Sequence, residues 1–357
     1  MMKDYFLKTC TRRNFLTYTS KLCFKVGLSS VFFAGLKTEA ASNSTKTFEP
    51  AYLKLQKTGE LKKRANKLYA SMERCELCPR RCGVNRLKGV SGFCCAPGAT
   101  LVVSAAHPHF GEERSLVGIG GSGTIFLTHC NLRCVFCQNW EIAQLGRGFE
   151  SNIDKLARMM LLLQKRGCHN INLVTPTHYS ALILKAVDIA AERGLRLPIV
   201  YNTSGWERLE ILKFLDGIVD IYLPDFKYWD SDMSAKYSSG ADSYPKITSE
   251  AILEMHRQVG VAKPATDGIM QRGLMIRHLV MPNNTGGSEE IMEWIAENLP
   301  KDTYVNIMAQ YNPLYKAYDY PELSRRITRE EYKKAVFRAK EMGLTNLDVQ
   351  GYWFLSG

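Results

Sequence analysis

The sequence GSGTIFLTHCNLRCVFCQNW, residues 121–140, joins a short β-rich run to a loop that carries three cysteines. The run at residues 124–128 has the β-branched and aromatic composition that is typical of a strand. Cys130, Cys134 and Cys137 follow it with the spacing C-x3-C-x2-C. In a (β/α) barrel the loop after a strand opens on the catalytic face, so this stretch indicates both a fold and a site.

The three thiols of this loop define a candidate metal centre. Three thiolates on one short loop can hold three corners of a [4Fe–4S] cluster, for which proteins usually provide four ligands. The missing ligand leaves one iron open to bind and activate another molecule, as an open position separates catalytic from structural zinc. A zinc-binding loop or an electron-carrying cysteine loop is the alternative interpretation.

From about residue 120 onward, short β-rich runs alternate with helical stretches. The expected strands are residues 124–128, 172–174, 198–202, 219–223, 274–281 and 304–309. The expected helices are residues 152–166, 180–193, 206–215, 249–259, 289–299 and 329–342, the last with Thr328 as its N-cap and Gly343 as its stop. This alternation implies parallel βαβ units. We expect an α/β fold, a partial (β/α)6 TIM-like barrel with an N-terminal cysteine-rich extension; a doubly wound open sheet is the second choice.

The composition is that of an ordinary globular protein, with 357 residues, 45% of them hydrophobic and 23% charged. Bulk disorder is excluded, and no uncharged apolar run reaches the length of about 18 residues that would predict a stable membrane span. The net charge is +12, of which residues 1–40 contribute +5 (seven basic minus two acidic), so the remainder carries about +7. This mild, spread charge predicts no nucleic-acid partner.

The N-terminal third divides into two predicted segments ahead of a core domain at residues 116–350. Residues 1–41 resemble a twin-arginine-type signal segment: TRRNFL at residues 11–16, an apolar stretch at 26–35 and a possible cleavage point at Ala40-Ala41. A basic cytosolic extension is the alternative. Residues 42–115 are predicted to hold a linker helix, at residues 53–70, and a cysteine-rich knuckle.

The knuckle offers four or five thiols within about twenty residues: Cys75, Cys78, Cys82, Cys94 and Cys95. Arginines beside them favour the thiolate form, and the segment is rich in glycine and has too little apolar content to fold by packing alone. A metal would supply the missing stabilisation, and zinc or an accessory iron–sulfur cluster is compatible with the ligands. The C-x2-C-x3-C spacing is less usual for zinc. Reduced thiols or a disulfide are the alternatives.

The C-x3-C-x2-C spacing, with the aromatic Phe136 directly before the third cysteine, resembles the signature of the radical S-adenosylmethionine (radical SAM) superfamily. The resemblance covers roughly residues 72–350 and is strongest to the pyruvate formate-lyase activating enzyme-like branch, of PflX type. The stretches that carry it are CELCPRRC at 75–82, GEE at 111–113, the cysteine loop through Gln138-Asn139, VTPTH at 174–178 and MAQY at 308–311.

The resemblance implies a cofactor pair and a reaction. Cys130, Cys134 and Cys137 would each bind one iron of a [4Fe–4S] cluster, and SAM would chelate the fourth iron. A low-potential electron donor of the flavodoxin or ferredoxin type would deliver the electron that splits SAM into methionine and a 5′-deoxyadenosyl radical. That radical would abstract a hydrogen atom, in the most concrete case from a glycine of a glycyl-radical enzyme. The alternatives are an enzyme that acts on a small molecule or another protein, and a non-catalytic iron–sulfur electron carrier.

The expected SAM contacts come from the ends of the predicted strands: Thr175, Thr177, Asp225, Lys227 and Arg277. Many radical SAM proteins have a Gly-Gly-Glu element where this chain has Thr175-Pro176-Thr177, so hydroxyl and backbone groups would replace its carboxylate. Asp225 and Lys227 resemble the Asp-x-Lys element of glycyl-radical activating enzymes. Arg277 is expected to meet the SAM carboxylate, because a guanidinium on a buried strand needs an anion.

Further residues near these strand ends have less specific expectations. His178 is either a proton donor or a structural histidine. Gln310, Tyr311 and Asn312 finish the last expected strand of the barrel and could face the substrate. Trp140, Trp206 and Trp229 are expected to be packing residues. The location is contested within the sequence, because a twin-arginine signal suggests export whereas SAM chemistry suggests the cytoplasm.

Overall fold

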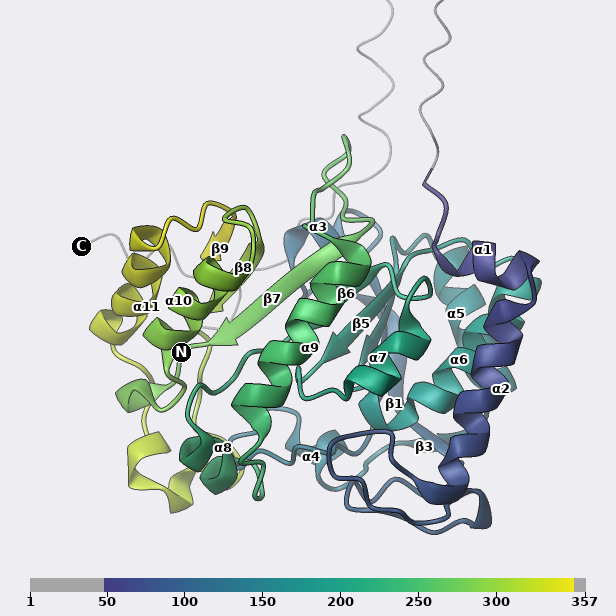
Figure 1. Ribbon diagram of the computed structural model, residues 1–357, viewed down its shortest axis with the longest axis horizontal. Helices are drawn as coiled ribbons and strands as arrows, with labels where there is room; N and C mark the ends of the chain where they lie inside the picture. The colour runs from purple at the N-terminus through teal and green to yellow at the C-terminus, as the bar shows by residue number, and fades with distance from the viewer. Residues whose placement is uncertain (1–47, 350–357) are drawn as a thin grey trace, which may run out of the picture. The chain divides into compact units, whose positions relative to one another are not determined.

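The computed structural model describes residues 48–349 (Figure 1). The predicted signal segment at residues 1–41 lies outside the described residues. No helix within residues 48–349 is long and apolar enough to cross a membrane. The boundary predicted between an extension and a core domain at residue 116 stays a prediction.

Among the described residues, nine strands form one sheet in the order β3-β1-β2-β4-β5-β6-β7-β8-β9. The strands are β1 (Leu101–His109), β2 (Ser122–Leu127), β3 (Phe149–Ser151), β4 (Ile171–Val174), β5 (Ile199–Thr203), β6 (Ile221–Pro224), β7 (Gly273–Leu279), β8 (Tyr304–Met308) and β9 (Leu347–Val349). The run from β2 to β9 is parallel, whereas β1 pairs antiparallel with both β2 and β3.

The strand order decides between the two expected folds. The six predicted strands are β2, β4, β5, β6, β7 and β8, and each lies beside the next in chain order. A doubly wound sheet reverses its order at a switch point, and this run has none. The predicted α/β fold with six consecutive parallel strands is therefore confirmed. β1, β3 and β9 were not predicted, because two of them are only three residues long and β1 carries polar and imidazole side chains.

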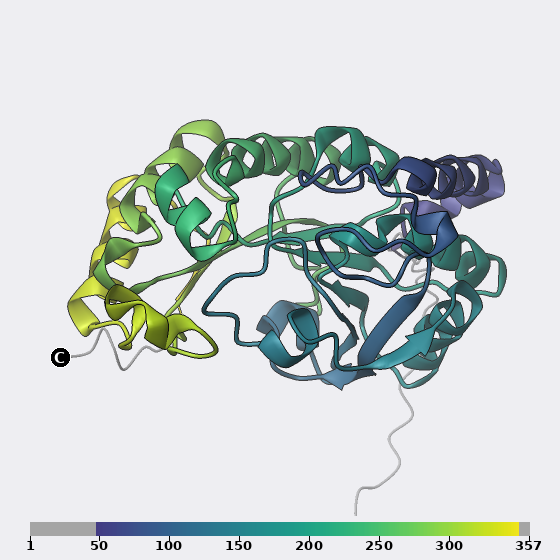
Figure 2. The same ribbon diagram turned by 90° about the horizontal axis from the view of Figure 1, so that it is seen from below.

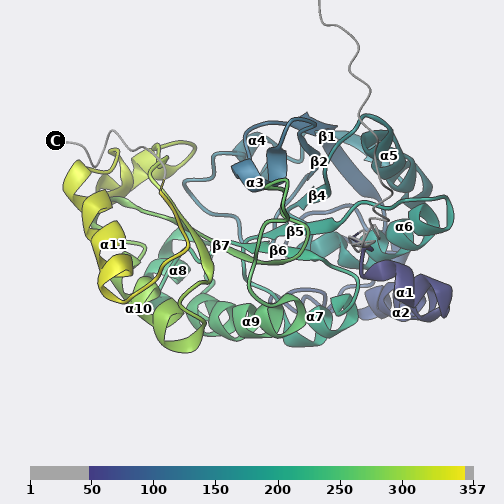
Figure 3. The same ribbon diagram turned by 90° about the horizontal axis from the view of Figure 1, so that it is seen from above.

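The longer helices connect successive parallel strands and follow one another along the outer face of the sheet (Figures 2 and 3). The α-helices are α1 (Tyr52–Lys57), α2 (Glu60–Ala70), α3 (Arg114–Val117), α4 (Trp140–Ala143), α5 (Ile153–Lys165), α6 (Ser180–Glu192), α7 (Leu209–Leu215), α8 (Ser231–Tyr237), α9 (Tyr244–Val259), α10 (Ser288–Asn298) and α11 (Arg329–Glu341). All six predicted helices are present, although α9 begins five residues earlier than expected, at Tyr244, with a proline in its first turn. The predicted Thr328 cap of α11 is present as a capping box with Glu331.

The segment that precedes the knuckle is anchored to the barrel. The predicted linker helix is split into α1 and α2, because Gly59 between them has a φ of 74°. Both helices contact α6. The backbone amide of Ala51 donates to the buried carboxylate of Asp220, which also accepts from the amide of Ile199 at the start of β5. This chain segment is thus tied to the sheet by a buried polar contact as well as by apolar packing.

Candidate active site

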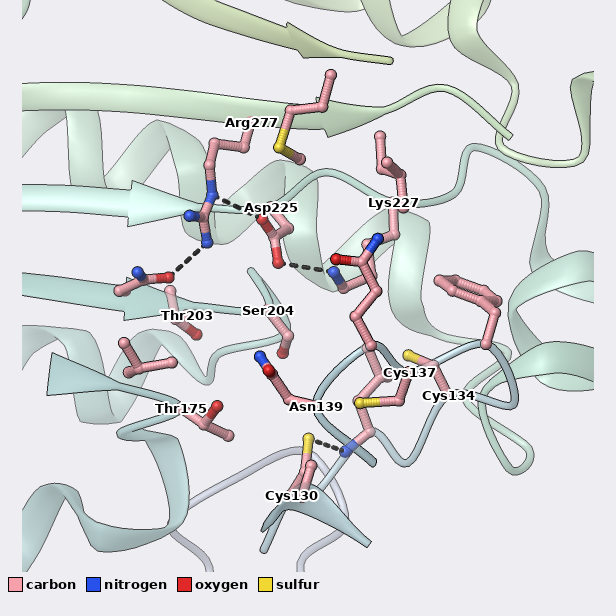
Figure 4. A pocket seen from close by; sticks show the side chains of 18 of the residues that line it. Cys130, Cys134, Cys137, Asn139, Thr175, Thr203, Ser204, Asp225, Lys227 and Arg277 are labelled. Carbon is pink, nitrogen blue, oxygen red and sulfur yellow. Dashed lines mark hydrogen bonds and ion pairs between the residues drawn. The ribbon is translucent and has the colours of Figure 1, made fainter. Parts of the chain in front are cut away.

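The carboxyl ends of the parallel strands surround a cavity of about 230 Å³ (Figure 4). Because all these strands run in one direction, residues that end them or follow them meet at the same edge of the sheet. The lining includes Thr175 after β4, Ser204 after β5, Asp225 after β6 and Gln310 after β8. The loop that follows β2 brings Cys130, Cys134 and Cys137 to the same cavity, as the sequence predicted.

The cysteine loop is held in place by contacts from distant segments. The amide of Val135 donates to the carbonyl of Tyr237, and its carbonyl accepts from the amide of Lys316, both at 2.9 Å. The Ser238 hydroxyl donates to Sγ of Cys134 at 3.1 Å. The buried ring of Phe136 packs against the rings of Tyr228 and Tyr311. These contacts fix the positions from which the three sulfurs face the cavity.

The thiols lie in a poorly hydrated environment. Burial raises the pKa of Cys134 to about 11, and burial together with the charges of the other two cysteines raises the pKa of Cys137 to about 12. The Lys227 ammonium acts in the opposite direction on both sulfurs. Stable thiolates at these positions therefore require a strong positive partner, which a metal centre supplies.

A charge network lines the side of the cavity that faces the cysteines. Nε of Arg277 donates to Asp225 at 2.9 Å, and Nζ of Lys227 donates to the other oxygen of Asp225 at 2.6 Å. Arg277 also donates to the side-chain oxygen of Asn202 and lies 3.5 Å from a Glu112 oxygen. The predicted anion beside Arg277 is thus present, but it is provided by two protein carboxylates.

The ionisation of this network follows from its pairing. Burial acts to raise the pKa of Asp225, but the cations Arg277 and Lys227 together lower it below its usual value. Burial acts to lower the pKa of Lys227, but Asp225 and the Cys134 thiolate raise it. Asp225 is therefore an anion and Lys227 a cation, and the ammonium stands beside the cysteine loop.

The donor set fits a polynuclear iron–sulfur centre. Within residues 48–349, no three His, Cys, Asp or Glu side chains stand as ligands of a single metal ion. A [4Fe–4S] cluster needs a wider arrangement, because each thiolate binds a different iron. Such an arrangement is present here, because three buried or half-buried thiols line one cavity beside the Lys227 ammonium.

Comparison with known proteins identifies the chemistry. The family model described as the radical SAM superfamily matches residues 124–295, which include β2, the cysteine loop and the strands up to β7. The chain belongs to the radical SAM superfamily. Membership implies a [4Fe–4S] cluster and SAM as cofactors, and makes the protein a radical SAM enzyme.

The chain also shows similarity to the following relatives and solved structures. Two uncharacterised proteins of Methanocaldococcus jannaschii are similar: MJ0674, at 34% identity over 76% of this chain and 75% of its own length, and MJ0808, at 25% identity over 76% and 82%. SuiB of Streptococcus suis, solved with bound S-adenosylmethionine, has a TM-score of 0.44 at 11% identity. A radical SAM methyltransferase of Sphaerobacter thermophilus has a TM-score of 0.44 at 16% identity. The match to SuiB covers 63% of this chain but only about half (49%) of SuiB. The match to the methyltransferase covers 64% of this chain and 65% of the methyltransferase.

One predicted residue of the radical SAM site, Thr177, lies away from the cavity, and His178 has one of the two roles expected for it. Thr177 is buried and does not line the cavity, because its hydroxyl donates to the buried carboxylate of Glu207. Thr203, which does line the cavity, donates to the same Glu207 oxygen. His178 is a structural histidine: it is buried, Nε2 donates to the carbonyl of Thr128, and burial lowers its pKa to about 3, so that it stays neutral.

The other candidate residues also divide into those that line the cavity and those that contact other parts of the protein. Gln310 lines the cavity, whereas Tyr311 donates to the Leu323 carbonyl and Asn312 accepts from Arg326. The three tryptophans pack against other side chains, as expected: Trp140 on Tyr315, Trp206 under Arg80 and Trp229 on Phe226. Four further residues line the cavity without having been predicted: Asn202, Thr203, Ser204 and Met308. Their position at strand ends was a usable signal.

Glu207 gives a pH-dependent stability that can be measured. Burial raises its pKa from 4.5 to about 7, so the folded state binds this proton more tightly than the unfolded chain. The protonated Glu207 carboxyl therefore makes its full contribution to the free energy of unfolding below pH 4.5. This contribution is lost as the pH rises through 7. We expect the free energy of unfolding of Glu207→Gln to exceed that of the wild type by about 3 kcal/mol at pH 8, and the two values to converge below pH 4.5.

Denaturant unfolding of the two proteins across this pH range checks the prediction. Glu250→Gln, which changes an exposed side chain on α9, is the matched control and should follow the wild type throughout. A difference between Glu207→Gln and wild type that does not vary with pH would contradict the assigned burial effect.

Proposed function

We propose that this radical SAM enzyme abstracts a hydrogen atom from a glycine of a partner protein, and thus acts as an activating enzyme. The observation that carries the proposal is the position of the cysteine loop at an open cavity. Gln138, Asn139 and Gln310 line this cavity and are exposed to solvent. A peptide segment of a second protein can therefore reach the cavity from outside.

The protein side chains have distinct proposed roles. Cys130, Cys134 and Cys137 would each bind one iron, and Thr175, Asp225, Lys227 and Arg277 would bind SAM. When bound, the cluster and SAM supply the 5′-deoxyadenosyl radical that takes the hydrogen atom. Thr177 would act indirectly, because it and Thr203 share the Glu207 carboxylate and so orient the hydroxyl that faces the cavity.

The finer assignments follow from the sequence resemblance. We propose membership of the activating enzyme-like branch of PflX type, a low-potential electron donor of the flavodoxin or ferredoxin type, and a glycyl-radical enzyme as partner. An iron–sulfur cluster or zinc at Cys75, Cys78, Cys82 and Cys94 is part of the same proposal. The twin-arginine signal and the export that it suggests also stay predictions.

Replacement of any one cluster cysteine is expected to abolish SAM cleavage. Cys130→Ala, Cys134→Ala and Cys137→Ala each remove one of three attachment points, so the open iron has no defined place. The measurement is 5′-deoxyadenosine formed anaerobically by reduced, reconstituted protein with SAM. Cys168→Ala is the matched control, because Cys168 is a buried cysteine away from the cavity, and it should keep full activity. Near-normal product from any of the three variants would refute the assignment.

The activating role predicts a radical on the partner. Reduced enzyme, SAM and a glycyl-radical enzyme of the pyruvate formate-lyase class should give the electron paramagnetic resonance doublet of a glycyl radical. Cys137→Ala in place of the wild type should give none. Formation of 5′-deoxyadenosine without a protein radical would reject the activating role, and would favour a small molecule or another protein as substrate.

Arg277→Lys is expected to weaken SAM binding by roughly 1–3 kcal/mol, the typical contribution of a charged hydrogen bond. Lysine has one nitrogen and cannot reproduce the planar fork that holds Asp225 and faces the cavity. Glu112→Gln is the control, because Glu112 contacts Arg277 but does not line the cavity. SAM affinity and melting temperature are measured on the same reconstituted samples. Unchanged affinity in Arg277→Lys with a lower melting temperature would show that Arg277 is structural.

A further inference from the structure

We infer that Cys75, Cys78, Cys82 and Cys94 bind a second iron–sulfur cluster, held against the cysteine loop of the radical SAM site. This inference rests on the proposed function and deepens it by choosing a cluster over zinc and naming its ligands. Its test reads metal content and not SAM cleavage, so the two can fail separately. Four thiols come from two turns of one glycine-rich segment, residues 75–95. Backbone hydrogen bonds within the described residues bring these thiols together.

The first turn brings three of the cysteines together. The amide of Cys75 donates to the carbonyl of Val84, and the amide of Gly83 donates back to the carbonyl of Cys75, both at 2.9 Å. This pair of bonds closes the intervening loop, so that Cys75 lies beside Cys82. Within the loop, the amide of Arg81 donates to the carbonyl of Cys78. The result is a tight turn with a cysteine at its start, middle and end.

The second turn adds the fourth thiol. The amide of Phe93 donates to Sγ of Cys82 at 3.3 Å, and a Cβ on Gly92 would stand only 3.0 Å from the same sulfur. Cys94 follows directly and is buried, as are Cys75 and Cys78. The contact of Phe93 with Cys82 thus brings the next residue, Cys94, to the first turn.

Cys95 is excluded from this group although it is adjacent to Cys94. Its φ of 64° turns it out of the knuckle, and its side chain is exposed. Its sulfur lies 3.4 Å from Nη1 of Arg133, on the radical SAM loop. The structure thus separates two neighbouring cysteines that the sequence could not distinguish.

A buried cation independently points to an anionic centre here. Arg86 is fully buried, its Nε donates to the Gly98 carbonyl and its Nη1 to the His178 carbonyl. Nη2 has no hydrogen-bond partner, and no carboxylate forms an ion pair with Arg86 among the ion pairs of residues 48–349. Its charge acts on Cys94. A buried guanidinium without a counter-ion is costly, and a cluster with four thiolates carries the negative charge that would balance it.

Arg80 connects the group to the radical SAM loop. Its Nε donates to the carbonyl of Asn131, next to Cys130, at 3.0 Å. Its Nη2 donates to the carbonyl of Ser238, whose hydroxyl donates to Cys134. The guanidinium lies over the ring of Phe93, 3.8 Å from its centroid. The knuckle that would hold the second cluster is thus hydrogen-bonded directly to the segment that carries Cys130 and to the residue that binds Cys134.

The arrangement favours a cluster over zinc. Zinc needs four sulfurs at about 2.3 Å from one point, and the C-x2-C-x3-C spacing of Cys75, Cys78 and Cys82 is less usual for that ion. The expected occupant of Cys130, Cys134 and Cys137 is also a cluster. In both groups each sulfur would bind a different iron.

The test isolates the second site by removing the first. The triple variant Cys130→Ala/Cys134→Ala/Cys137→Ala, purified and reconstituted anaerobically, should retain about four iron and four sulfide per chain and give the resonance of a [4Fe–4S] cluster on reduction. Addition of Cys94→Ala should remove at least three quarters of that iron. Addition of Cys95→Ala, the matched control, should leave it unchanged.

The other outcomes overturn the inference. Zinc without iron, or no metal above trace, in the triple variant would exclude a second cluster. Equal iron loss on adding Cys94→Ala or Cys95→Ala would exclude the ligand set. If the triple variant does not fold, the same question is asked of the otherwise native protein: about eight iron per chain should fall to about four in Cys94→Ala, and four in both would refute the second cluster.

Discussion

Three thiolates must hold a four-iron cluster in one position while one iron stays free, and much of this structure serves that requirement. Three attachment points fix a cluster only when the loop that carries them is itself fixed. The Val135 backbone is held from both sides, by the segments around Tyr237 and Lys316, and Ser238 binds the Cys134 sulfur. Residues a hundred or more positions further along the chain are thus part of the site, because they fix the position of the cysteine loop.

Charge compensation explains the interior around the cavity. A charge can be buried only beside an opposite charge or good hydrogen-bond partners. Arg277 has Asp225 on one side and Glu112 on the other, and Asp225 also holds Lys227. Glu112 belongs to the GEE stretch at residues 111–113, before β2. Its contact with Arg277 gives this stretch a structural role in the network. Arg86 stands out because its partners are two carbonyls and the cysteine knuckle.

The knuckle and the radical SAM loop are physically one region. Arg80 donates to the Asn131 and Ser238 carbonyls, and its guanidinium contacts the rings of Phe93 and Trp206. Arg133 reaches back from the loop to Cys95. The knuckle is therefore in direct contact with the segment that carries Cys130 and Cys134. The family fixes the chemistry of that segment but not the substrate.

The sequence by itself determined the six parallel strands, the helices between them and the three cysteines, because these depend on local periodicity, capping and residue spacing. It also placed Asp225, Lys227 and Arg277 near one another, since the ends of parallel strands meet at one edge. Only the tertiary structure decided that Arg277 pairs with Asp225 and Glu112, that Thr177 binds Glu207 and that His178 is buried and neutral. It alone separated Cys94 from Cys95. These outcomes depend on which side chains from distant segments share one small volume, and no local pattern in the chain encodes that proximity.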